Sequence, residues 1–322
     1  MDVLQQIIQP ISKDLELCRT MLGADMKHAN PLLGTALRLI NTRSGKMMRP
    51  MLTLLSACLS GTVNDATLHA AVAYEAFHTA SLIHDDVVDD STQRRGQESI
   101  NSMSGSKVAV LVGDYILALA LQHISATNNP ELVNILSDAA KGLSHGELLQ
   151  LANTQTSALS EETYFDIIRN KTAALFAACA QSGAITVNAD SQTVDCMYRF
   201  GMLAGMCFQI KDDIFDYFDN NIGKPTGNDM AEGKLTLPAI HALQTGIDAP
   251  KNLVDKIKAR TATHDEIQQL VDYTKQNGGI SYAETVMNRY ADEAKMLLSE
   301  YPDTSVKAAM MAYIDYVLRR NY

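Results

Sequence analysis

Hydrophobic positions along most of the chain recur at spacings of three and four residues. Leu, Ala, Met, Gln and Glu dominate these segments, and alternating runs of β-branched residues are scarce. This periodicity is typical of amphipathic helices. Breaks are expected where Gly, Pro and Asn gather, as at Asn30-Pro31, from Gly45 to Arg49-Pro50, from Gly61 to Asp65 and at Tyr301-Pro302. The pattern predicts an all-α fold of roughly ten or more helices with short connections.

The chain has no Gly/Ser-rich, Pro-rich or highly charged segment that would serve as a linker. We therefore expect residues 1–322 to form a single helical domain. One weak internal repeat is present, because the segment 83–89 resembles the segment 210–216, and a basic loop containing glycine follows each copy. These segments look like two copies of one functional motif.

Each copy carries three aspartates: Asp85-Asp86-x-x-Asp89 in the first and Asp212-Asp213-x-x-Asp216 in the second. Residues four apart share one face of a helix, and like charges at that spacing destabilise it. A chain that repeats the arrangement after two apolar segments is expected to bind cations there. Hard carboxylate oxygens suit Mg²⁺, which also keeps waters and substrate phosphates in its shell.

Composition limits the class of protein. The 322 residues include 37 acidic and 27 basic ones, for a formal charge of −10, which disfavours a nucleic-acid partner that needs a general basic surface. An anionic small molecule remains possible through local cations or bound metal ions. The five cysteines are scattered without a Cys-x-x-Cys pair, which predicts reduced thiols rather than disulfides or a zinc site.

The sequence gives no sign of targeting. The first ten residues contain Asp2 and no basic residue, so a signal peptide is not expected. The longest apolar stretch, 108–121, is interrupted by Gly113-Asp114 and is judged too short to span a bilayer. We predict a soluble, cytoplasmic protein without a transmembrane segment.

Several motifs resemble those of the trans-isoprenyl (polyprenyl) diphosphate synthases, and the match extends from Gly45 to about Lys234. Beside the two aspartate clusters they are Gly45-Lys46-x-x-Arg49-Pro50, Arg94-Arg95-Gly96, Gly113-Asp114, Gly146-Glu147-x-x-Gln150, Lys171-Thr172, Phe208-Gln209 and Gly223-Lys224-Pro225-x-Gly227-x-Asp229 with Lys234. Their order and spacing agree with the family. The chain is most similar to its long-chain type, the octaprenyl and heptaprenyl diphosphate synthases.

The resemblance implies a helical bundle of the isoprenoid synthase type with a central active-site cavity. It also implies a head-to-tail condensation, in which an allylic diphosphate, farnesyl or geranyl, loses pyrophosphate and alkylates isopentenyl diphosphate. The cofactor would be Mg²⁺, three ions in all, held by the six aspartates. A homodimer formed by helices near Gly113-Asp114 is usual in the family, and the product would be delivered to a membrane.

The resemblance also assigns the other candidate residues. Arg94, Lys171, Lys224 and Lys234 would bind the departing diphosphate, and Lys46, Arg49, His78 and Arg95 would bind isopentenyl diphosphate. The oxygens of Thr172 and Gln209 would face the allylic carbon. Departing pyrophosphate is expected to remove the final proton, so no side chain is needed as general base. We expect Arg319 and Arg320 at the end of the chain to be solvated.

Small residues before the first cluster predict the length of the product. Ala80 stands five residues before Asp85, where short-chain members of the family carry an aromatic plug, and Ser81 is also small. Phe77 lies one turn deeper and is a candidate floor of the pocket. One helical turn rises about 5.4 Å, close to one isoprene unit, which favours a product of about C30 to C45 for quinone side chains.

Other classes of protein remain possible. A short-chain farnesyl or geranylgeranyl diphosphate synthase differs only in product length. A class I terpene cyclase shares the fold but carries an Asn/Ser/Glu pattern in place of the second cluster, and a head-to-head condensing enzyme has its aspartates in another context. An inert partner subunit would lack aspartates from one cluster, whereas all six are present here.

Overall fold

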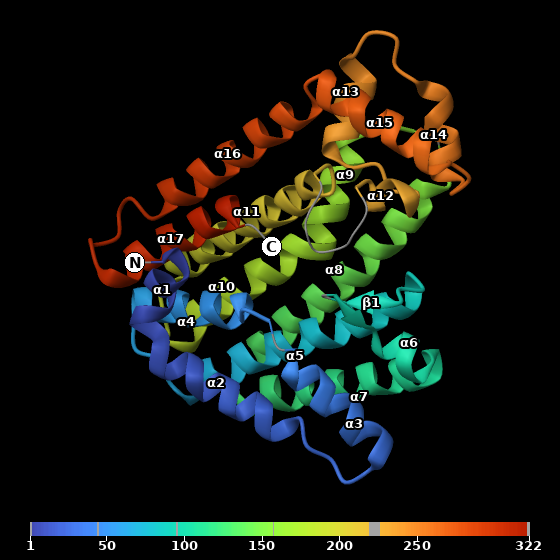
Figure 1. The fold of residues 1–322 in the computed structure, drawn as a ribbon. Coiled ribbons are helices and arrows are strands. Elements are labelled where there is room, and N and C mark those ends of the chain that lie inside the picture. Colours follow the sequence, from blue (N-terminus) through green and yellow to red (C-terminus); the bar gives the residue numbers. More distant parts are fainter. Residues whose placement is uncertain (1, 44, 95, 157, 219–225, 321–322) are drawn as a thin grey trace. The chain divides into compact units, whose positions relative to one another are not determined.

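The structure, a computed structural model, describes residues 2–43, 45–94, 96–156, 158–218 and 226–320. Helices account for most of these residues, and the strands among them form one short two-stranded hairpin (Figure 1). The predicted all-α fold is confirmed.

The elements follow one another in chain order. The first group is α1 (Val3–Ile8), η1 (Gln9–Ile11), α2 (Ser12–Asp25), α3 (Pro31–Thr42), α4 (Met48–Ser60), α5 (Asp65–Val88), β1 (Gln93–Arg94), β2 (Gln97–Glu98), α6 (Ile100–Ser104) and α7 (Ser106–Ala126). The second group is α8 (Pro130–Thr154), α9 (Glu161–Ile168), η2 (Arg169–Ala173), α10 (Ala174–Thr186), α11 (Ser191–Phe215), α12 (Asn228–Ala231), α13 (Leu237–Thr245), α14 (Lys251–Lys258), α15 (His264–Gln276), α16 (Gly279–Leu297) and α17 (Ser305–Arg319).

The chain forms two compact units. Unit 1 comprises residues 1–138, 178–198 and 301–312, and unit 2 comprises residues 139–177, 199–300 and 313–322. The first aspartate cluster belongs to unit 1 and the second to unit 2.

In unit 1, α5 and α7 lie side by side along most of their lengths (Figure 1). The ring of His84 on α5 approaches Gly113 on α7, where an added Cβ would lie 2.3 Å from the Nε2 atom. The same Nε2 atom lies 3.4 Å from an oxygen of Asp114. The Gly113-Asp114 motif thus allows α7 to pack closely against the helix that ends in the first cluster.

The start of α5 is also fixed. Asn64 is its N-cap residue, and its side-chain oxygen accepts a hydrogen bond of 3.0 Å from the backbone N–H of Thr67. Its side-chain nitrogen donates to the backbone carbonyl of Thr186, at 2.7 Å. The cap therefore ties the beginning of α5 to the end of α10 within unit 1.

In unit 2, α9 and α10 are joined by η2, a π-helical turn of five residues that carries Lys171 and Thr172. Such turns are rare in helices and occur frequently at functional sites. Close packing against α11 accompanies this turn, because a Cβ added at Gly205 would lie 2.5 Å from the Cα atom of Ala173. The sequence motifs include Lys171-Thr172 but carry no signal for a π-turn at this position.

The predicted break at Gly45 is present between α3 and α4, and it ends before Pro50, which lies in the first turn of α4, where its missing N–H has no helical partner to lose. One expectation about a segment is wrong. The apolar stretch around Gly113-Asp114 is not interrupted, since α7 continues through it for 21 residues and is long and apolar enough to cross a membrane on those grounds alone. The length argument against a spanning segment therefore fails.

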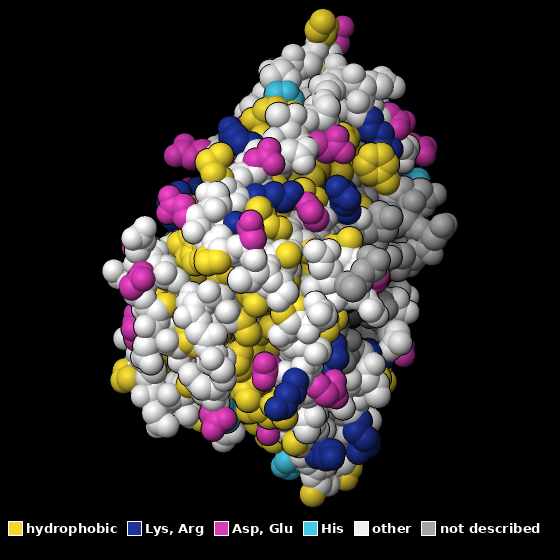
Figure 2. Space-filling model, turned by 90° about the vertical axis from the view of Figure 1, so that its left-hand side faces the viewer, with side chains coloured by type: hydrophobic (Ala, Val, Ile, Leu, Met, Phe, Trp, Pro, Cys, Tyr) yellow, Lys and Arg dark blue, Asp and Glu magenta, His cyan; other side chains and the backbone are white. Residues whose placement is uncertain are grey.

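All five cysteines are free thiols, as predicted. Burial raises the pKa of Cys18, Cys179 and Cys207 to about 12, so these thiols stay protonated at neutral pH. The face drawn in Figure 2 mixes acidic and basic side chains with exposed hydrophobic ones. The basic side chains on this face are interspersed with acidic ones, as expected for local cationic groups rather than a general basic surface.

Candidate active site

The first aspartate cluster lies at the C-terminal end of α5. The helix ends at Val88, and the backbone N–H of Asp89 still donates to the carbonyl of Asp85 at 2.8 Å. The negative end of the helix dipole disfavours additional carboxylates at this position. The arrangement therefore favours a cation there.

The middle aspartate of this cluster is the buried one. Asp86 is 3% exposed, whereas Asp85 and Asp89 are half-buried. The Nε atom of Arg94 donates to the carboxylate of Asp86 at 2.8 Å, and the side chain of Asn101 donates to its backbone carbonyl at 3.1 Å. A predicted diphosphate-binding cation is thus paired with a predicted metal ligand.

A cavity of about 90 Å³ lies beside this cluster in unit 1. It brings together His78, Gly45, Asp86 and Arg94 with apolar side chains of α2, α3 and α5. Among the other predicted residues of this unit, Lys46 is exposed and Arg49 is 8% exposed. Three candidates for control of chain length are buried on α5: Phe77, Ala80 and Ser81.

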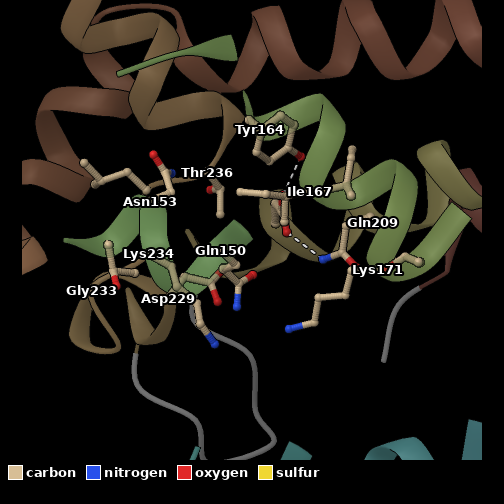
Figure 3. A pocket seen from close by; sticks show the side chains of 15 residues that line it. Gln150, Asn153, Tyr164, Ile167, Lys171, Gln209, Asp229, Gly233, Lys234 and Thr236 are labelled. Atoms are coloured by element: carbon tan, nitrogen blue, oxygen red, sulfur yellow. Dashed lines mark hydrogen bonds between the residues drawn. The ribbon is translucent and has the colours of Figure 1, made fainter. Parts of the chain in front are cut away.

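The second cluster repeats this construction at the end of α11. Asp213 is 4% exposed, and Asp212 and Asp216 on either side are half-buried. The hydroxyl of Tyr164 and the side-chain nitrogen of Gln209 both donate to the Asp213 carboxylate, at 2.5 and 2.9 Å (dashed in Figure 3). Neutral donors hold this aspartate, in contrast to the arginine that holds Asp86.

The hydrogen-bond network extends to the π-turn. The hydroxyl of Thr172 donates to the side-chain oxygen of Gln209 at 2.7 Å, which fixes the orientation of this amide. Thr172, Gln209 and Asp213 therefore act as one connected unit in which each side chain positions the next.

The pKa of Asp213 is raised to about 7, mainly because the carboxyl is buried and also because Asp212 and Asp216 lie nearby. The hydrogen bonds from Tyr164 and Gln209 oppose this rise. Burial also raises the pKa of the Tyr164 phenol well above its ordinary value, and the Asp213 charge adds to the effect. These donors alone therefore do not offset the cost of burying the negative charge of Asp213.

The third aspartate of this cluster holds the start of α12. The backbone N–H groups of Asn228 and Asp229 donate to the two carboxylate oxygens of Asp216, at 3.0 and 3.1 Å. Burial raises the pKa of Asp229 well above its ordinary value, and Asp216 and Asp213 raise it further. Three acidic groups therefore face one another at this end of unit 2.

Two predicted cations line a cavity of about 130 Å³ that also contains Asp213 and Asp229 (Figure 3). Lys171 forms an ion pair with Glu147, and the ammonium nitrogen of Lys234 lies 2.6 Å from an oxygen of Glu232. Both pairs are mostly shielded from solvent. An incoming diphosphate would have to replace these carboxylate partners.

Arg320 does not lie in solvent as expected. Its side chain is 12% exposed and forms an ion pair with Asp212. Arg319 is exposed, as predicted. The expectation for Arg320 is wrong because the contact between the end of α17 and α11 is a tertiary one that no local pattern indicates.

Two predicted residues, Arg95 and Lys224, lie outside the described residues. Sequence reasoning missed Tyr164, Asp229 and Glu147 as members of the site. The motifs themselves included Asp229 and Glu147, so a signal for these two was present. Tyr164 had no comparable signal, since it contacts Asp213 across 49 positions of the sequence.

The carboxylates suit a divalent cation. No group of three or more His, Cys, Asp or Glu side chains in the described ranges could hold a metal ion alone. Mg²⁺, however, usually takes one or two protein carboxylates and completes its shell with waters and substrate phosphates. The raised pKa of Asp213 fits this requirement, because a nearby cation would stabilise its buried charge.

An all-helical chain with acidic clusters at two helix ends, each next to cationic side chains, has the features of an enzyme that handles a metal-bound diphosphate. Comparison with known proteins identifies the family. The family model for polyprenyl synthetase matches residues 30–274. The octaprenyl diphosphate synthase of Haemophilus influenzae is 31% identical over 326 residues, covering 100% of this chain and 97% of that protein.

Solved structures of related synthases agree with this family assignment. A geranylgeranyl pyrophosphate synthase from Bacteroides thetaiotaomicron is 46% identical, with a TM-score of 0.89, and the match covers 99% of this chain and 100% of that one. A polyprenyl synthase from Caulobacter crescentus, complexed with calcium and isoprenyl diphosphate, is 30% identical with a TM-score of 0.93 and 98% coverage of both chains.

The chain belongs to the polyprenyl synthetase family and is a prenyltransferase. Its family uses isopentenyl and allylic diphosphates and is generally magnesium-dependent. The predicted family, fold class and enzyme class are confirmed, and the octaprenyl relative supports the long-chain type.

Proposed function

We propose that the protein extends an allylic diphosphate, farnesyl or geranyl, by head-to-tail addition of isopentenyl diphosphate to an all-trans product of about C30 to C45. The observation that carries the proposal is the shared construction of the two clusters. In each, a buried middle aspartate held by hydrogen-bond donors lies between two half-buried ones at the end of a helix. One such helix end would be ordinary, but two of the same design in a prenyltransferase favour a metal-binding role for each cluster.

Mg²⁺ is the proposed cofactor, with three ions held by Asp85, Asp86, Asp89, Asp212, Asp213 and Asp216. The ions would supply the positive charge that stabilises departing pyrophosphate. The Caulobacter relative, with its calcium and isoprenyl diphosphate, supports a divalent cation as part of this chemistry. The chain itself would orient the carboxylates through Arg94, Tyr164 and Gln209.

The cations divide between the two substrates. Arg94, Lys171, Lys224 and Lys234 would bind the departing diphosphate, and Lys46, Arg49, His78 and Arg95 the diphosphate of isopentenyl diphosphate. In the structure, Arg94, Lys171 and Lys234 each contact a carboxylate. These carboxylates would hold the cations in position until the substrate arrives. Substrate phosphate oxygens would then replace them.

Thr172 and Gln209 would present their oxygens to the allylic carbon as positive charge develops. A hydroxyl and an amide supply dipoles without a strong nucleophile that could capture the cation. The hydrogen bond between them, together with the bond from Gln209 to Asp213, supports fixed orientations.

Chain length would be set on α5. Ala73, Phe77 and Ala80 follow one another at spacings of four and three, so they lie on one face, and all three are buried. We expect Ala80→Phe to shorten the product to about C15 or C20 and Phe77→Ala to lengthen it, because each turn accommodates about one isoprene unit. Reversed-phase chromatography of the dephosphorylated products measures both effects, and unchanged lengths in both variants would remove this assignment.

A short-chain synthase is the second candidate function. The 46% identity with a geranylgeranyl pyrophosphate synthase favours it. Ala80 argues against a short-chain product, because the short-chain members of the family carry an aromatic plug at this position and an alanine leaves it open. The size of the product decides between the two.

We further propose that residues 1–322 act as one domain. Four of the five borders between units 1 and 2 fall inside helices, in α8, α10, α11 and α17, and the fifth lies between α16 and α17. Long helices that continue across a border are uncommon between independent domains, which are usually joined by flexible linkers.

A homodimer is proposed through α7. This helix exposes Leu111 by 68% and Leu121 by 50%, an apolar surface suited to burial by a second copy. Leu111→Glu should shift the protein toward the monomer in light scattering after size exclusion. Ile247→Glu is the matched control, since Ile247 is 83% exposed on the connection between α13 and α14 and should leave the mass unchanged.

The proposed location is the cytoplasm, without a membrane-spanning segment, and the product would be delivered to a membrane for quinone synthesis. The soluble character of related prenyltransferases supports this proposal.

The test of the proposed activity is incubation of the purified protein with farnesyl diphosphate, labelled isopentenyl diphosphate and Mg²⁺. Label should enter a solvent-extractable product, and EDTA should abolish its incorporation. Absence of incorporation, with EDTA making no difference, would reject the proposal. Consumption of farnesyl diphosphate without isopentenyl diphosphate would indicate a terpene cyclase instead.

A further inference from the structure

The end of α17 places an arginine on the second aspartate cluster. The guanidinium carbon of Arg320 lies 3.6 Å from the centre of the Phe208 ring and 6.0 Å from the centre of the Phe215 ring. One of its nitrogen atoms donates to the backbone carbonyl of Phe208 at 3.0 Å and to the carboxylate of Asp212. All of these residues belong to unit 2.

The partners of Arg320 form a regular pattern on α11. Phe208, Asp212 and Phe215 stand at positions i, i+4 and i+7, so they follow one another along one face of the helix. An aromatic ring contacts the flat surface of the guanidinium, and the carboxylate and carbonyl accept its in-plane N–H groups. This combination is specific for arginine, because a lysine ammonium has no flat surface to stack.

The contact has an electrostatic consequence for Asp212. This aspartate lies in the last turn of α11, where the helix dipole and the neighbouring Asp213 and Asp216 all disfavour its negative charge. Arg320 neutralises this charge within a largely shielded contact, since its side chain is 12% exposed. A divalent cation at Asp212 must therefore compete with a positive group already in place.

We propose that Arg320 is a positioning residue that serves as counter-ion of Asp212 before substrate binds and weakens divalent-cation binding by the second cluster. A diphosphate adds negative charge and so restores the affinity that the guanidinium removes. Metal binding would thereby be coupled to the presence of substrate. The inference rests on the proposed metal role of the second cluster.

The test uses the full-length protein without substrate and Mn²⁺ as probe, because carboxylate sites accept Mn²⁺ as well as Mg²⁺. Free Mn²⁺ is measured by electron paramagnetic resonance in a titration of wild type, Arg320→Met, Arg320→Lys and Arg319→Met. Arg320→Met should bind Mn²⁺ at least about threefold more tightly than wild type, because it removes a competing charge from a partly buried pair. Arg319 is exposed, so Arg319→Met should match wild type.

Two further measurements keep the test decisive. Thermal unfolding without metal shows that each variant is folded, and the stabilisation by Mn²⁺ should be larger for Arg320→Met than for wild type. In the Asp212→Asn background, Arg320→Met should no longer tighten Mn²⁺ binding, because the pair is already broken. Arg320→Lys should fall between wild type and Arg320→Met.

Equal or weaker Mn²⁺ binding by Arg320→Met, in a protein whose wild type binds Mn²⁺, would overturn the inference and leave the proposed function standing. Arg320 would then only pack α17 against α11. Failure of the wild type to bind Mn²⁺, alone or with pyrophosphate, would contradict the proposed metal role and the inference together.

Discussion

The hydroxyl of Tyr164 donates to the buried carboxylate of Asp213 in the second cluster. Residues that orient metal ligands typically change metal affinity or activity by about 10-fold to 100-fold when they are replaced. Tyr164→Phe keeps the ring and removes the donor. We expect a loss of activity of about tenfold, with a higher Mg²⁺ concentration needed for half-maximal rate.

The matched control for this variant is Tyr282→Phe. The hydroxyl of Tyr282 donates to Glu161 at 2.8 Å in the same unit, so the same atom is removed outside the cluster. A steady-state assay over a range of Mg²⁺ concentrations measures both variants. An equal Mg²⁺ requirement in Tyr164→Phe and Tyr282→Phe would show that Tyr164 does not position a metal ligand.

A second prediction at the residue scale concerns pH. In unit 1, the Nδ1 atoms of His69 and His123 lie 2.9 Å apart, and the Nε2 atom of His123 lies 2.7 Å from Asp25. Burial lowers the pKa of His69 below 6.5, and His123 lowers it further, while Asp65 and Asp25 oppose the shift. The folded protein thus binds this proton more weakly than the unfolded chain, so the free energy of unfolding should fall as pH drops below about 6.5.

Urea unfolding at pH 7.5 and 5.5 measures this effect. His69→Gln should show a smaller fall between the two values than wild type, because it lacks the shifted group. His145→Gln removes an exposed histidine of α8 and serves as control. If His69→Gln loses as much stability as the control on acidification, the histidine pair does not contribute.

The positions of the two aspartate clusters at helix ends could be predicted from their spacing and from the apolar segments before them, and their role as metal ligands stays a prediction. Tyr164 and Arg320 could not be predicted. Each reaches its aspartate from a distant part of the chain, and such contacts depend on which helices pack together rather than on local pattern.

At the scale of elements, the first cluster depends on where α5 begins as well as on where it ends. Asn64 caps the helix and also donates to the carbonyl of Thr186. Loss of an N-cap costs about 1 kcal/mol, and a buried carbonyl left without its donor adds to this cost. We expect Asn64→Ala to lower the free energy of unfolding by about 2 kcal/mol.

Thr263→Ala is the control, since Thr263 forms a capping box at the start of α15. It should cost about 1 kcal/mol, because only the cap is lost. Urea unfolding compares the two, and a cost for Asn64→Ala no greater than that for Thr263→Ala would contradict the role of the Thr186 contact.

Helices were predictable as elements wherever their start carried a local signal, as at Asn30-Pro31. The π-turn that carries Lys171 and Thr172 could not be predicted in this way. It lies where α11 approaches closely at Gly205, which is a tertiary contact. The continuity of α7 through Gly113 also has a tertiary cause. Glycine there admits the ring of His84 instead of ending the helix.

At the scale of the whole molecule, the two compact units raise the question of how cooperatively the chain unfolds. We expect a single transition, because α8, α10, α11 and α17 each contribute residues to both units. Calorimetry and circular dichroism should give coincident midpoints. Two separated transitions would indicate that units 1 and 2 are independent domains.

The class of the molecule was predictable because its motifs combine charge type, spacing and order in a way that few functions require. Product length is encoded less directly. It depends on the space above Ala80 and Phe77, which the packing of other helices determines as much as the residues of α5 do.

The most direct test of the account is therefore the size of the product made by the wild-type protein. Farnesyl diphosphate and excess labelled isopentenyl diphosphate are incubated with Mg²⁺, and the dephosphorylated products are separated by chromatography. We expect chains of about C30 to C45. Products that stop at about C20 would contradict the long-chain assignment, and a complete lack of elongated product would contradict the proposed function itself.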